Sequence, residues 1–423
     1  MLIVVDSKKN RNFAKNLISK CIYLKMNTIR QNKQGLKVLT AGVVLQLFLG
    51  ILYVWSVFKA PVSLHYGWEP FDVGLTASFM LCFFAVGIFA GGKAQAIIGV
   101  KLTTLIGGLM VSAGMLATAL IPAQGQSPVF LIYLFYGIIG GAGVGAAYNA
   151  IISNAQRWFP ENRGFATGVS VCAFGLSTVI FAPLIEILNN NVEVNITLLI
   201  LSGIFAAAAL STFGFIKSPD QVSNASIPVL KGKQYTPIEM IKTLRFYLIA
   251  LSMMFGMSVF FVINPDLKDL AINRNAAYFA TILVMVMGIA NTLGRLCVPL
   301  LSDKMGRESS GIIILSATAL SAFCLCFVEG VWLIAAISVV AFCYGGFAGL
   351  YPVLTSDNFG IKNVGSNYGA VTVGFMLSAL LFPFLINKIE LQTMKFVALG
   401  IFASFGAIFI VFLKIINAKR IKD

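Results

Sequence analysis

The sequence is poor in charged residues. Asp, Glu, Lys and Arg make up 11% of its 423 residues, whereas a soluble domain carries about 25%. Hydrophobic residues make up 58%, and the mean hydropathy is +0.88. These values exclude an ordinary soluble globular protein, and we expect a polytopic membrane protein.

The side chains that carry most enzyme and metal chemistry are also scarce. The one histidine is His65, and none of the 16 acidic residues lies clearly inside an apolar run, although Glu186 and Glu329 lie near the ends of two. Intramembrane acid–base pairs and metal sites therefore lack their usual ligands. Six of the seven cysteines lie in apolar runs, and Cys21 precedes the runs, so no disulfide or zinc framework is indicated. We expect neither an enzyme nor a cofactor.

Long apolar runs recur along the whole chain. A helix needs about 20 apolar residues to cross a hydrocarbon core of about 30 Å, and backbone groups in lipid must be hydrogen-bonded within each segment. The predicted fold class is therefore all-α, with twelve transmembrane helices. The predicted spans are 36–58, 71–95, 100–122, 128–152, 163–187, 195–216, 245–264, 276–300, 310–329, 331–354, 365–387 and 394–416.

The basic residues are unevenly distributed between the two sides of the membrane. The net charge of +15 would suggest nucleic acid as the partner of a soluble protein. With both termini in the cytoplasm, however, 9 Lys and Arg precede the first span, 12 lie in loops on that side and 4 in the C-terminal tail, against 5 on the opposite side. This distribution follows the positive-inside rule. We expect a multi-pass protein of the cell membrane with two cytoplasmic termini and no nucleic-acid partner.

The predicted spans divide into two halves. The longest polar interval between spans, 217–242, has six spans before it and six after it. We predict a basic cytoplasmic tail at 1–35, six-helix bundles at 36–216 and 243–416, and a short tail at 417–423. The first tail does not resemble a secretory signal and is attracted at most to membrane lipid; Met26 is an alternative start. The linker ends in Thr236-Pro237-Ile238-Glu239, which is typical of a helix N-terminus with a capping box.

Cytoplasmic turns of the two halves resemble each other. AYNAIISNAQRWFPENRG joins spans four and five, and LYPVLTSDNFGIKNVGSNYG joins spans ten and eleven. Tyr148 and Tyr351 lie 203 residues apart within them, and Gly99 and Gly306 lie 207 residues apart in another pair of turns. Such a repeat predicts two related bundles with a binding site between them near the midplane, as in alternating-access transporters. Chance similarity among apolar helices is the alternative.

One cation, Arg295, lies inside a predicted span. A charged side chain at the centre of a membrane helix costs roughly 2.5 to 3.5 kcal/mol on insertion scales, and such residues usually face a cavity. Because no carboxylate lies near it in sequence, we infer that a carboxylate substrate supplies the counter-charge, bound by the planar fork of the guanidinium. Asn291, one turn earlier, is placed to orient it. The alternative is that Arg295 snorkels to the cytoplasmic interface.

Other residues are candidates for the cavity wall and for a gate. Aromatic side chains within the spans are candidate walls, although ordinary packing is the alternative for each: Tyr53, Trp55, Tyr148, Phe174, Tyr344 and Phe375. The cytoplasmic turn that follows span eight contains three charged residues, Asp303, Lys304 and Arg307. We expect this turn to form a state-dependent ion pair with a neighbouring helix; a solvated loop is the alternative.

These motifs resemble those of a known transporter superfamily. GRLCVPLLSDKMGR resembles the signature turn of the major facilitator superfamily, and the matching stretch GGKAQAIIGVK has Ala96 where that signature has aspartate. Within it, NAQRWFPENRGFATG, LYVWSVFKAP, the Asn291 to Arg295 spacing and the SDNFG and NYG motifs of 356–369 resemble the oxalate:formate antiporter family. The resemblance implies a monomer that exchanges or imports small carboxylates, with the carboxylate on Arg295 and with Tyr53 and Tyr148 lining the cavity.

The sequence also departs from that family. Its oxalate transporter has a lysine where this chain has Phe375, and two cations suit a dianion whereas one suits a monoanion. Thr372 and Ala348 stand in place of bulky aromatic residues, Tyr344 in place of tryptophan and Phe174 in place of tyrosine. We therefore expect a short monocarboxylate such as lactate, pyruvate or formate. Monocarboxylate transporters have aspartate at the position of Asn291, so coupling to a proton needs another route here.

Several alternatives stay open at this stage. The sequence is also compatible with an exchanger of the oxalate/formate type, with an exporter of drugs or metabolites, and with a carboxylate sensor that does not transport. Exchange against a counter-anion and symport with a proton or sodium are both open. So is the direction of net flux.

Overall fold

The described part of the chain is helical. The computed structural model describes residues 32–123, 127–219 and 233–422, except 266, 277, 279 and 387. This part contains helices and no strand, which confirms the predicted all-α class. Most of the predicted tail at 1–35 and much of the linker at 217–242 lie outside the described residues. Helices of the first half are α2 (Lys33–Leu49), η1 (Gly50–Val54), α3 (Trp55–Tyr66), α4 (Pro70–Ile97), α5 (Gly99–Ala119), α6 (Phe130–Ile132), η2 (Tyr133–Gly140), α7 (Gly141–Trp158), α8 (Arg163–Asn191) and α9 (Val194–Phe213).

The short helix α10 (Pro237–Ile241) lies at the end of the predicted linker, before the second half. Thr236 and Glu239 form the predicted capping box, in which each side chain bonds to the main-chain N–H of the other residue. The remaining helices are α11 (Leu244–Ile263), α12 (Leu267–Asn273), α13 (Ala280–Met305), α14 (Arg307–Cys324), α15 (Gly330–Phe359), α16 (Val364–Val371), α17 (Val373–Ile386) and α18 (Gln392–Lys422).

Eleven stretches of the described chain are long and apolar enough to cross a membrane. The twelfth predicted span, 310–329, corresponds to α14, which is 18 residues long and begins with Arg307 and Glu308. These charged residues lower its mean hydropathy, but α14 packs against α15 and α18 as part of the bundle. The last predicted span, 394–416, also differs, because α18 continues as helix to Lys422 through the predicted tail.

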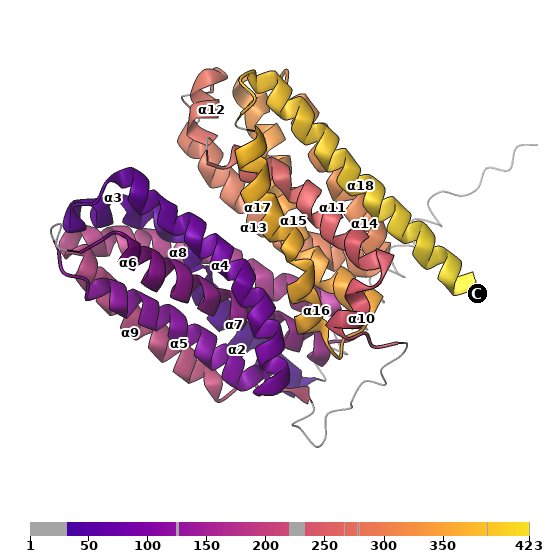
Figure 1. The fold of residues 1–423 in the computed structure, drawn as a ribbon, viewed down its shortest axis with the longest axis horizontal. Helices are drawn as coiled ribbons and strands as arrows, with labels where there is room; N and C mark the ends of the chain where they lie inside the picture. The colour runs from indigo at the N-terminus through magenta and orange to yellow at the C-terminus, as the bar shows by residue number, and fades with distance from the viewer. Residues whose placement is uncertain are drawn as a thin grey trace, which may run out of the picture.

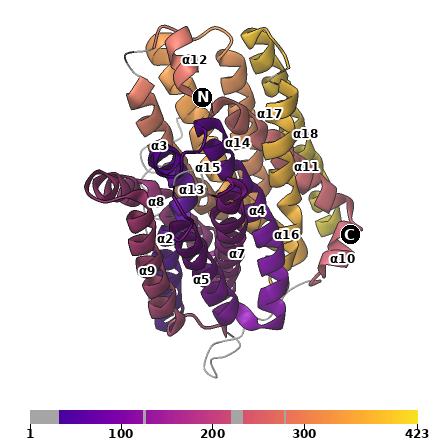
Figure 2. The same ribbon diagram turned by 60° about the vertical axis from the view of Figure 1, so that its left-hand side comes forward.

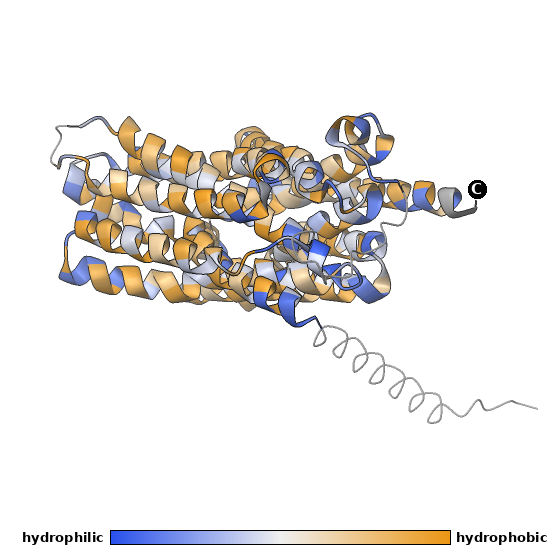
Figure 3. Ribbon diagram, turned by 90° about the horizontal axis from the view of Figure 1, so that it is seen from below, coloured by the Kyte–Doolittle hydropathy of each residue, from blue (hydrophilic) through white to orange (hydrophobic). Residues whose placement is uncertain are grey.

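The two halves lie side by side (Figures 1 and 2). They touch along two main lines, where α8 packs against α13 and where α4 packs against α16. Apolar residues cover most of the length of the helices, and hydrophilic residues gather towards their ends (Figure 3). We call the end with turns at 97–99, 159–163, 303–307 and 360–363 the inner face, which the charge distribution predicts to be cytoplasmic. The opposite end is the outer face.

The first membrane helix is interrupted near its middle. A 3₁₀ segment, Gly50–Val54, separates α2 from α3. Gly50 touches the main chain of α8, and a Cβ atom added there would lie 2.1 Å from the carbonyl oxygen of Phe174. Short 3₁₀ stretches inside a helix often mark functional positions. Here the stretch contains Tyr53, one of the predicted site residues.

Candidate functional site

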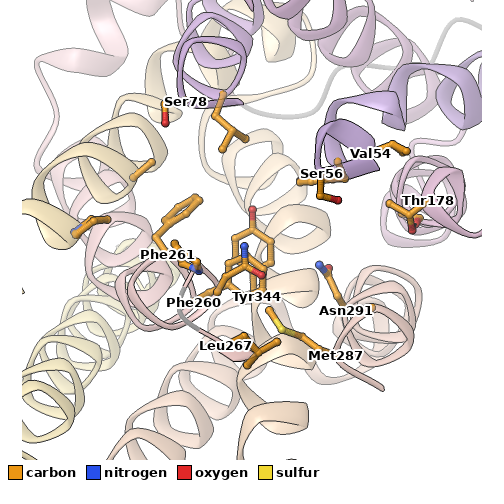
Figure 4. A pocket seen from close by; sticks show the side chains of 18 of the residues that line it. Val54, Ser56, Ser78, Thr178, Phe260, Phe261, Leu267, Met287, Asn291 and Tyr344 are labelled. Atoms are coloured by element: carbon orange, nitrogen blue, oxygen red, sulfur yellow. The ribbon is translucent and has the colours of Figure 1, made fainter. Parts of the chain in front are cut away.

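A cavity of about 690 Å³ lies between the two halves. Both halves contribute to its wall, and in Figure 4 side chains such as Ser56 and Ser78 of the first half face Tyr344 and Asn291 of the second. The lining extends to the outer ends of the helices, at Asn264 and the start of α12. The cavity therefore reaches towards the outer face and ends near the centre of the protein.

Arg295 lies at the inner end of this cavity. Its residue surface is only 1% exposed. Nε donates a hydrogen bond to Oδ1 of Asn291 at 3.0 Å, and Nη2 donates to the hydroxyl of Tyr53 at 3.0 Å. The guanidinium carbon lies 5.4 Å from the ring centre of Tyr53 and 5.7 Å from that of Phe174. The side chain points into the space between the halves, which differs from the snorkelling arrangement.

Glycines allow the main chains around Arg295 to approach closely. A Cβ atom on Gly294 would lie 1.9 Å from the carbonyl oxygen of Phe342, and one on Gly345 would lie 1.9 Å from that of Asn291. On the opposite side, a Cβ atom on Gly175 of α8 would lie 3.1 Å from Cδ of Arg295. These close approaches pack α13 against α15 and α8, and they fix the helix that carries the cation.

The predicted wall residues fall on two sides of Arg295. Tyr53, Asn291 and Tyr344 line the main cavity, whereas four others line a small chamber of about 20 Å³ that also contacts Tyr53, Arg295 and Tyr344: Tyr148, Phe174, Thr372 and Phe375. The chamber is lined by residues of both halves. The structure thus gathers the seven other candidate site residues around Arg295.

Aromatic rings that line the chamber and the cavity contact one another. Phe375 of the second half meets Phe84 of the first with ring centres 6.0 Å apart. Tyr148 meets Phe174 at 5.0 Å, and Tyr344 stacks on Phe260 at 3.6 Å. Trp55, another candidate wall, instead packs within the first half, where its indole N–H donates to the carbonyl of Val73 at 3.1 Å.

Sequence reasoning missed several lining residues. Ser56, Thr178, Asn264 and Thr292 supply polar groups to the main cavity. Each is a single neutral polar residue in an apolar run. Nothing in the sequence distinguishes it from a polar side chain that packs inside a bundle or bonds to the main chain of its own helix. Tyr368 lines the chamber, and its place in the NYG motif was the one available signal.

A network of ionic contacts joins the halves at the inner face. Asp303 of α13 accepts hydrogen bonds from the main-chain N–H groups of Gly164 at 3.1 Å and Phe165 at 3.2 Å, at the start of α8. It also pairs with Arg307. Asp357 accepts from Arg163 at 2.6 Å and from Arg307 at 2.9 Å. We call this network, residues 163–165, 303, 307 and 357, the charged seam.

The charged seam includes two of the three predicted gate residues. The Asp303 and Arg307 side chains are 5% and 11% exposed, so the turn is joined to α8 and differs from a solvated loop. Lys304 is exposed and lies outside the network. The partners Arg163 and Asp357 belong to the RWFPENRG and SDNFG motifs, but no role was predicted for either.

A second line of contact joins α4 and α7 to α16 without ions. The Nδ2 group of Asn149 donates to the carbonyls of Ile88 at 2.7 Å and Gly365 at 2.8 Å. The hydroxyl of Ser366 donates to the carbonyl of Gly92 at 2.6 Å. We call this line, residues 88, 92, 149, 365 and 366, the neutral seam. Among the described residues, no ion pair crosses it.

Comparison with known proteins gives matches over most of the chain. A family model described as Major Facilitator Superfamily matches residues 39–383. An uncharacterized MFS-type transporter, YhjX of Escherichia coli (strain K12), is 28% identical over 81% of this chain and 85% of its own length. The oxalate:formate antiporter of Oxalobacter formigenes is 26% identical over 78% of each chain. Monocarboxylate transporter 12 of Xenopus laevis is 23% identical over 82% of this chain and 79% of its own.

Solved structures agree on the architecture. The fucose:proton symporter of E. coli superposes with a TM-score of 0.66 at 14% identity, over 88% of this chain and 98% of that one. At this identity the likeness shows the fold alone.

Proposed function

The chain belongs to the Major Facilitator Superfamily, and from that premise we propose that it is a secondary transporter of a small carboxylate anion. The proposed substrate is a short monocarboxylate such as lactate, pyruvate or formate. The proposed site consists of Arg295 and the residues around it, and the proposed location is the cell membrane with both termini in the cytoplasm.

The single observation that carries this proposal is the environment of Arg295. Its hydrogen-bond partners, Asn291 and Tyr53, are both neutral. Among the described residues that line the main cavity and the chamber, there is no Asp, Glu, Lys or His. An unpaired charge away from water is costly, and a carboxylate ligand offsets that cost with charge-assisted hydrogen bonds. The site therefore favours an anion and gives no partner to a cation.

The number of charges supports a monoanion. Arg295 is the one cation among the described lining residues, and Phe375, where the oxalate transporter has lysine, lines the chamber as an aromatic ring. A second carboxylate would have no positive partner there. Oxalate exchange is the second candidate, because a relative is named for that reaction. The two candidates differ in a measurable way, since only the second predicts efficient exchange of a dianion.

The arrangement of the cavity supports alternating access. The cavity reaches towards the outer face, while the two seams join the halves at the inner face. A bound anion neutralises Arg295, which lowers the cost of enclosing the cation when both faces are closed. The gate role of Asp303 and Arg307 is part of this proposal, and Lys304 has no part in it beyond its position in the turn.

Transport into liposomes tests the proposal. Purified protein is reconstituted into liposomes loaded with unlabelled acid, and entry of labelled lactate, pyruvate, formate and oxalate is followed in parallel. We expect one or more monoanions to enter and oxalate to be excluded. Arg295→Gln should lower uptake by about 100-fold or more, which corresponds to roughly 3 kcal/mol for charge-assisted hydrogen bonds. Arg295→Lys keeps the charge without the fork and should retain a larger part of the activity.

Size-exclusion profiles and melting temperatures show whether the variants fold. Normal uptake by well-folded Arg295→Gln would contradict the role of the cation. Efficient oxalate exchange would favour the second candidate. Absence of flux for every acid would favour an exporter or a sensor, and lipophilic cations and binding assays would then separate those two.

A further inference from the structure

Two side chains of the neutral seam reach from one half of the protein to the main chain of the other. Asn149 of α7 donates to Gly365 of α16, and Ser366 of α16 donates to Gly92 of α4. The two hydrogen bonds run in opposite directions across the seam. Neither involves a group that carries a charge at ordinary pH.

Asn149 connects three helices at once. Its single amide group donates to Ile88 of α4 and to Gly365 of α16 while its own main chain belongs to α7. The residue is 0% exposed, so water does not compete for these hydrogen bonds. If α16 moves away, one N–H of a buried amide loses its acceptor, which is unfavourable until water enters. Asn149 therefore favours the closed arrangement of this seam.

The main chains meet directly beside these hydrogen bonds. A Cβ atom on Gly92 would lie 2.4 Å from the carbonyl oxygen of Gly365, and one on Gly369 would lie 2.8 Å from Cα of Phe89. Lys93 lies next to this contact, but its ammonium group stands over the ring of Phe89 at 4.6 Å, within its own helix. The seam is thus held by neutral groups and by close packing.

Comparison of the two halves shows that the neutral seam lacks the carboxylate of the charged seam. Asp303 precedes Gly306 by three residues, and the corresponding position before Gly99 is Ala96. Ala96 has no carboxylate that could accept from the start of α16 as Asp303 does from the start of α8. In the neutral seam, the hydrogen bonds of Asn149 and Ser366 take the place that the carboxylate of Asp303 has in the charged seam.

We propose that Asn149 and Ser366 form an uncharged inner gate, which holds α4 and α7 against α16 and whose closure is independent of ionic strength. They act as positioning residues for the movement between states and do not touch the substrate. Salt weakens interactions between exposed charges, with a Debye length of about 10 Å at 0.1 M, but has little effect on hydrogen bonds between neutral buried groups. The more exposed pair of the charged seam, Arg163 and Asp357, should therefore weaken as salt rises, while the neutral seam should not change. The inference rests on family membership and not on the identity of the substrate.

Distance measurements on the full-length protein in nanodiscs test this inference without any substrate. Spin labels on encoded unnatural amino acids leave the native cysteines in place. One pair, at 93 and 362, spans the neutral seam, and a second pair, at 161 and 304, spans the charged seam; all four native residues are exposed. Pulsed electron resonance then gives the populations of short and long distances at 50 and 500 mM salt.

Ser366→Ala is the main variant, because it removes one hydrogen bond from a partly exposed side chain. We expect the long-distance population at 93 and 362 to rise about fivefold, the factor that corresponds to one hydrogen bond, and by the same factor at both salt concentrations. Asn149→Ala should give a larger rise. Ser404→Ala is the matched control, because its hydroxyl donates within one helix to Gly400 at 2.8 Å, and it should change neither distance.

Two outcomes would overturn the inference. One is an unchanged distance in folded Ser366→Ala. The other is a neutral seam that opens with salt as much as the charged seam does in the unmodified protein. If Asn149→Ala fails to fold, Ser366→Ala still decides. Because no carboxylate takes part, failure here leaves the assignment of Arg295 untouched, and failure of transport leaves the gate untouched.

Discussion

The charged seam and the neutral seam occupy related places in the two halves but are built differently. In the charged seam, the carboxylate of Asp303 accepts hydrogen bonds from main-chain N–H groups at the start of α8. In the neutral seam, side-chain donors of Asn149 and Ser366 reach main-chain carbonyls. Donor and acceptor have exchanged roles between side chain and main chain. A structural repeat can therefore keep a contact between helices while its chemistry changes completely.

The two seams should also differ in how they respond to their surroundings. The outer pair of the charged seam, Arg163 and Asp357, has side chains that are 23% and 35% exposed, so salt should weaken it. Asn149 is fully buried. A protein with one seam of each kind should keep part of its inner closure when the ionic strength changes.

Among the changes predicted here, removal of the carboxylate of Asp303 should have the largest effect, and it should open the charged seam. Asp303→Asn keeps the shape of the side chain but removes one of the two carboxylates that pair with Arg307, and it weakens the hydrogen bonds that Asp303 accepts at the start of α8. Loss of these charge-assisted hydrogen bonds costs about 3 kcal/mol in total. We expect the open population of the charged seam to rise about 100-fold, as measured with the label pair at 161 and 304. An unchanged distance there would show that the seam is held by packing alone.

Replacement of a tightly packed glycine by alanine should open one seam in each variant, because the added methyl group separates the helices. A Cβ atom on Gly164 would lie 2.0 Å from the carbonyl oxygen of Pro299, and one on Gly92 would lie 2.4 Å from that of Gly365. Such overpacking costs typically about 1 to 3 kcal/mol. We expect Gly164→Ala to lengthen mainly the distance across the charged seam and Gly92→Ala mainly that across the neutral seam.

The control for these replacements is Gly203→Ala, because nothing lies within 4 Å of a Cβ atom there. It should leave both distances unchanged. If either replacement lengthens both distances equally, the seams open together as one rigid unit. The two seams would then differ in chemistry but not in their movement.

Introduction of a carboxylate into the neutral seam should have the smallest effect. Ala96→Asp places an anion at the position that corresponds to Asp303, near the start of α16. A charge at the N-terminus of a helix stabilises it by about 0.3 to 1 kcal/mol at low salt. We expect the neutral seam to close about twofold more tightly at 50 mM salt and to lose this gain at 500 mM. Ala96→Asn, which has the same shape without the charge, should show no salt dependence.

The sequence predicted the larger features because each depends on local patterns. Apolar length located the spans, the Thr236 to Glu239 spacing located a capping box, and the scarcity of charge drew attention to Arg295. The criterion of apolar length was less suited to α14, whose charged first turn belongs to the helix as well as to the inner face.

Other features depend on contacts between distant parts of the chain. Tyr148 lines only the chamber, whereas Tyr344 lines the main cavity as well, and this difference depends on how distant helices pack. Asn149 and Ser366 gave no signal, because neutral polar residues in membrane helices commonly bond within their own helix. Only the packed arrangement shows that theirs cross between the halves.

The hydrogen bonds of Arg295 leave the guanidinium with donors to spare. It has five N–H groups, and two of them point to Asn291 and Tyr53. The other three have no acceptor among the described residues. A carboxylate that approaches end-on can therefore take two N–H groups while both existing hydrogen bonds stay in place. In the proposed mode of binding, the anion adds to the site without displacing a hydrogen-bond partner of Arg295, and Tyr53 keeps its hydrogen bond to the cation.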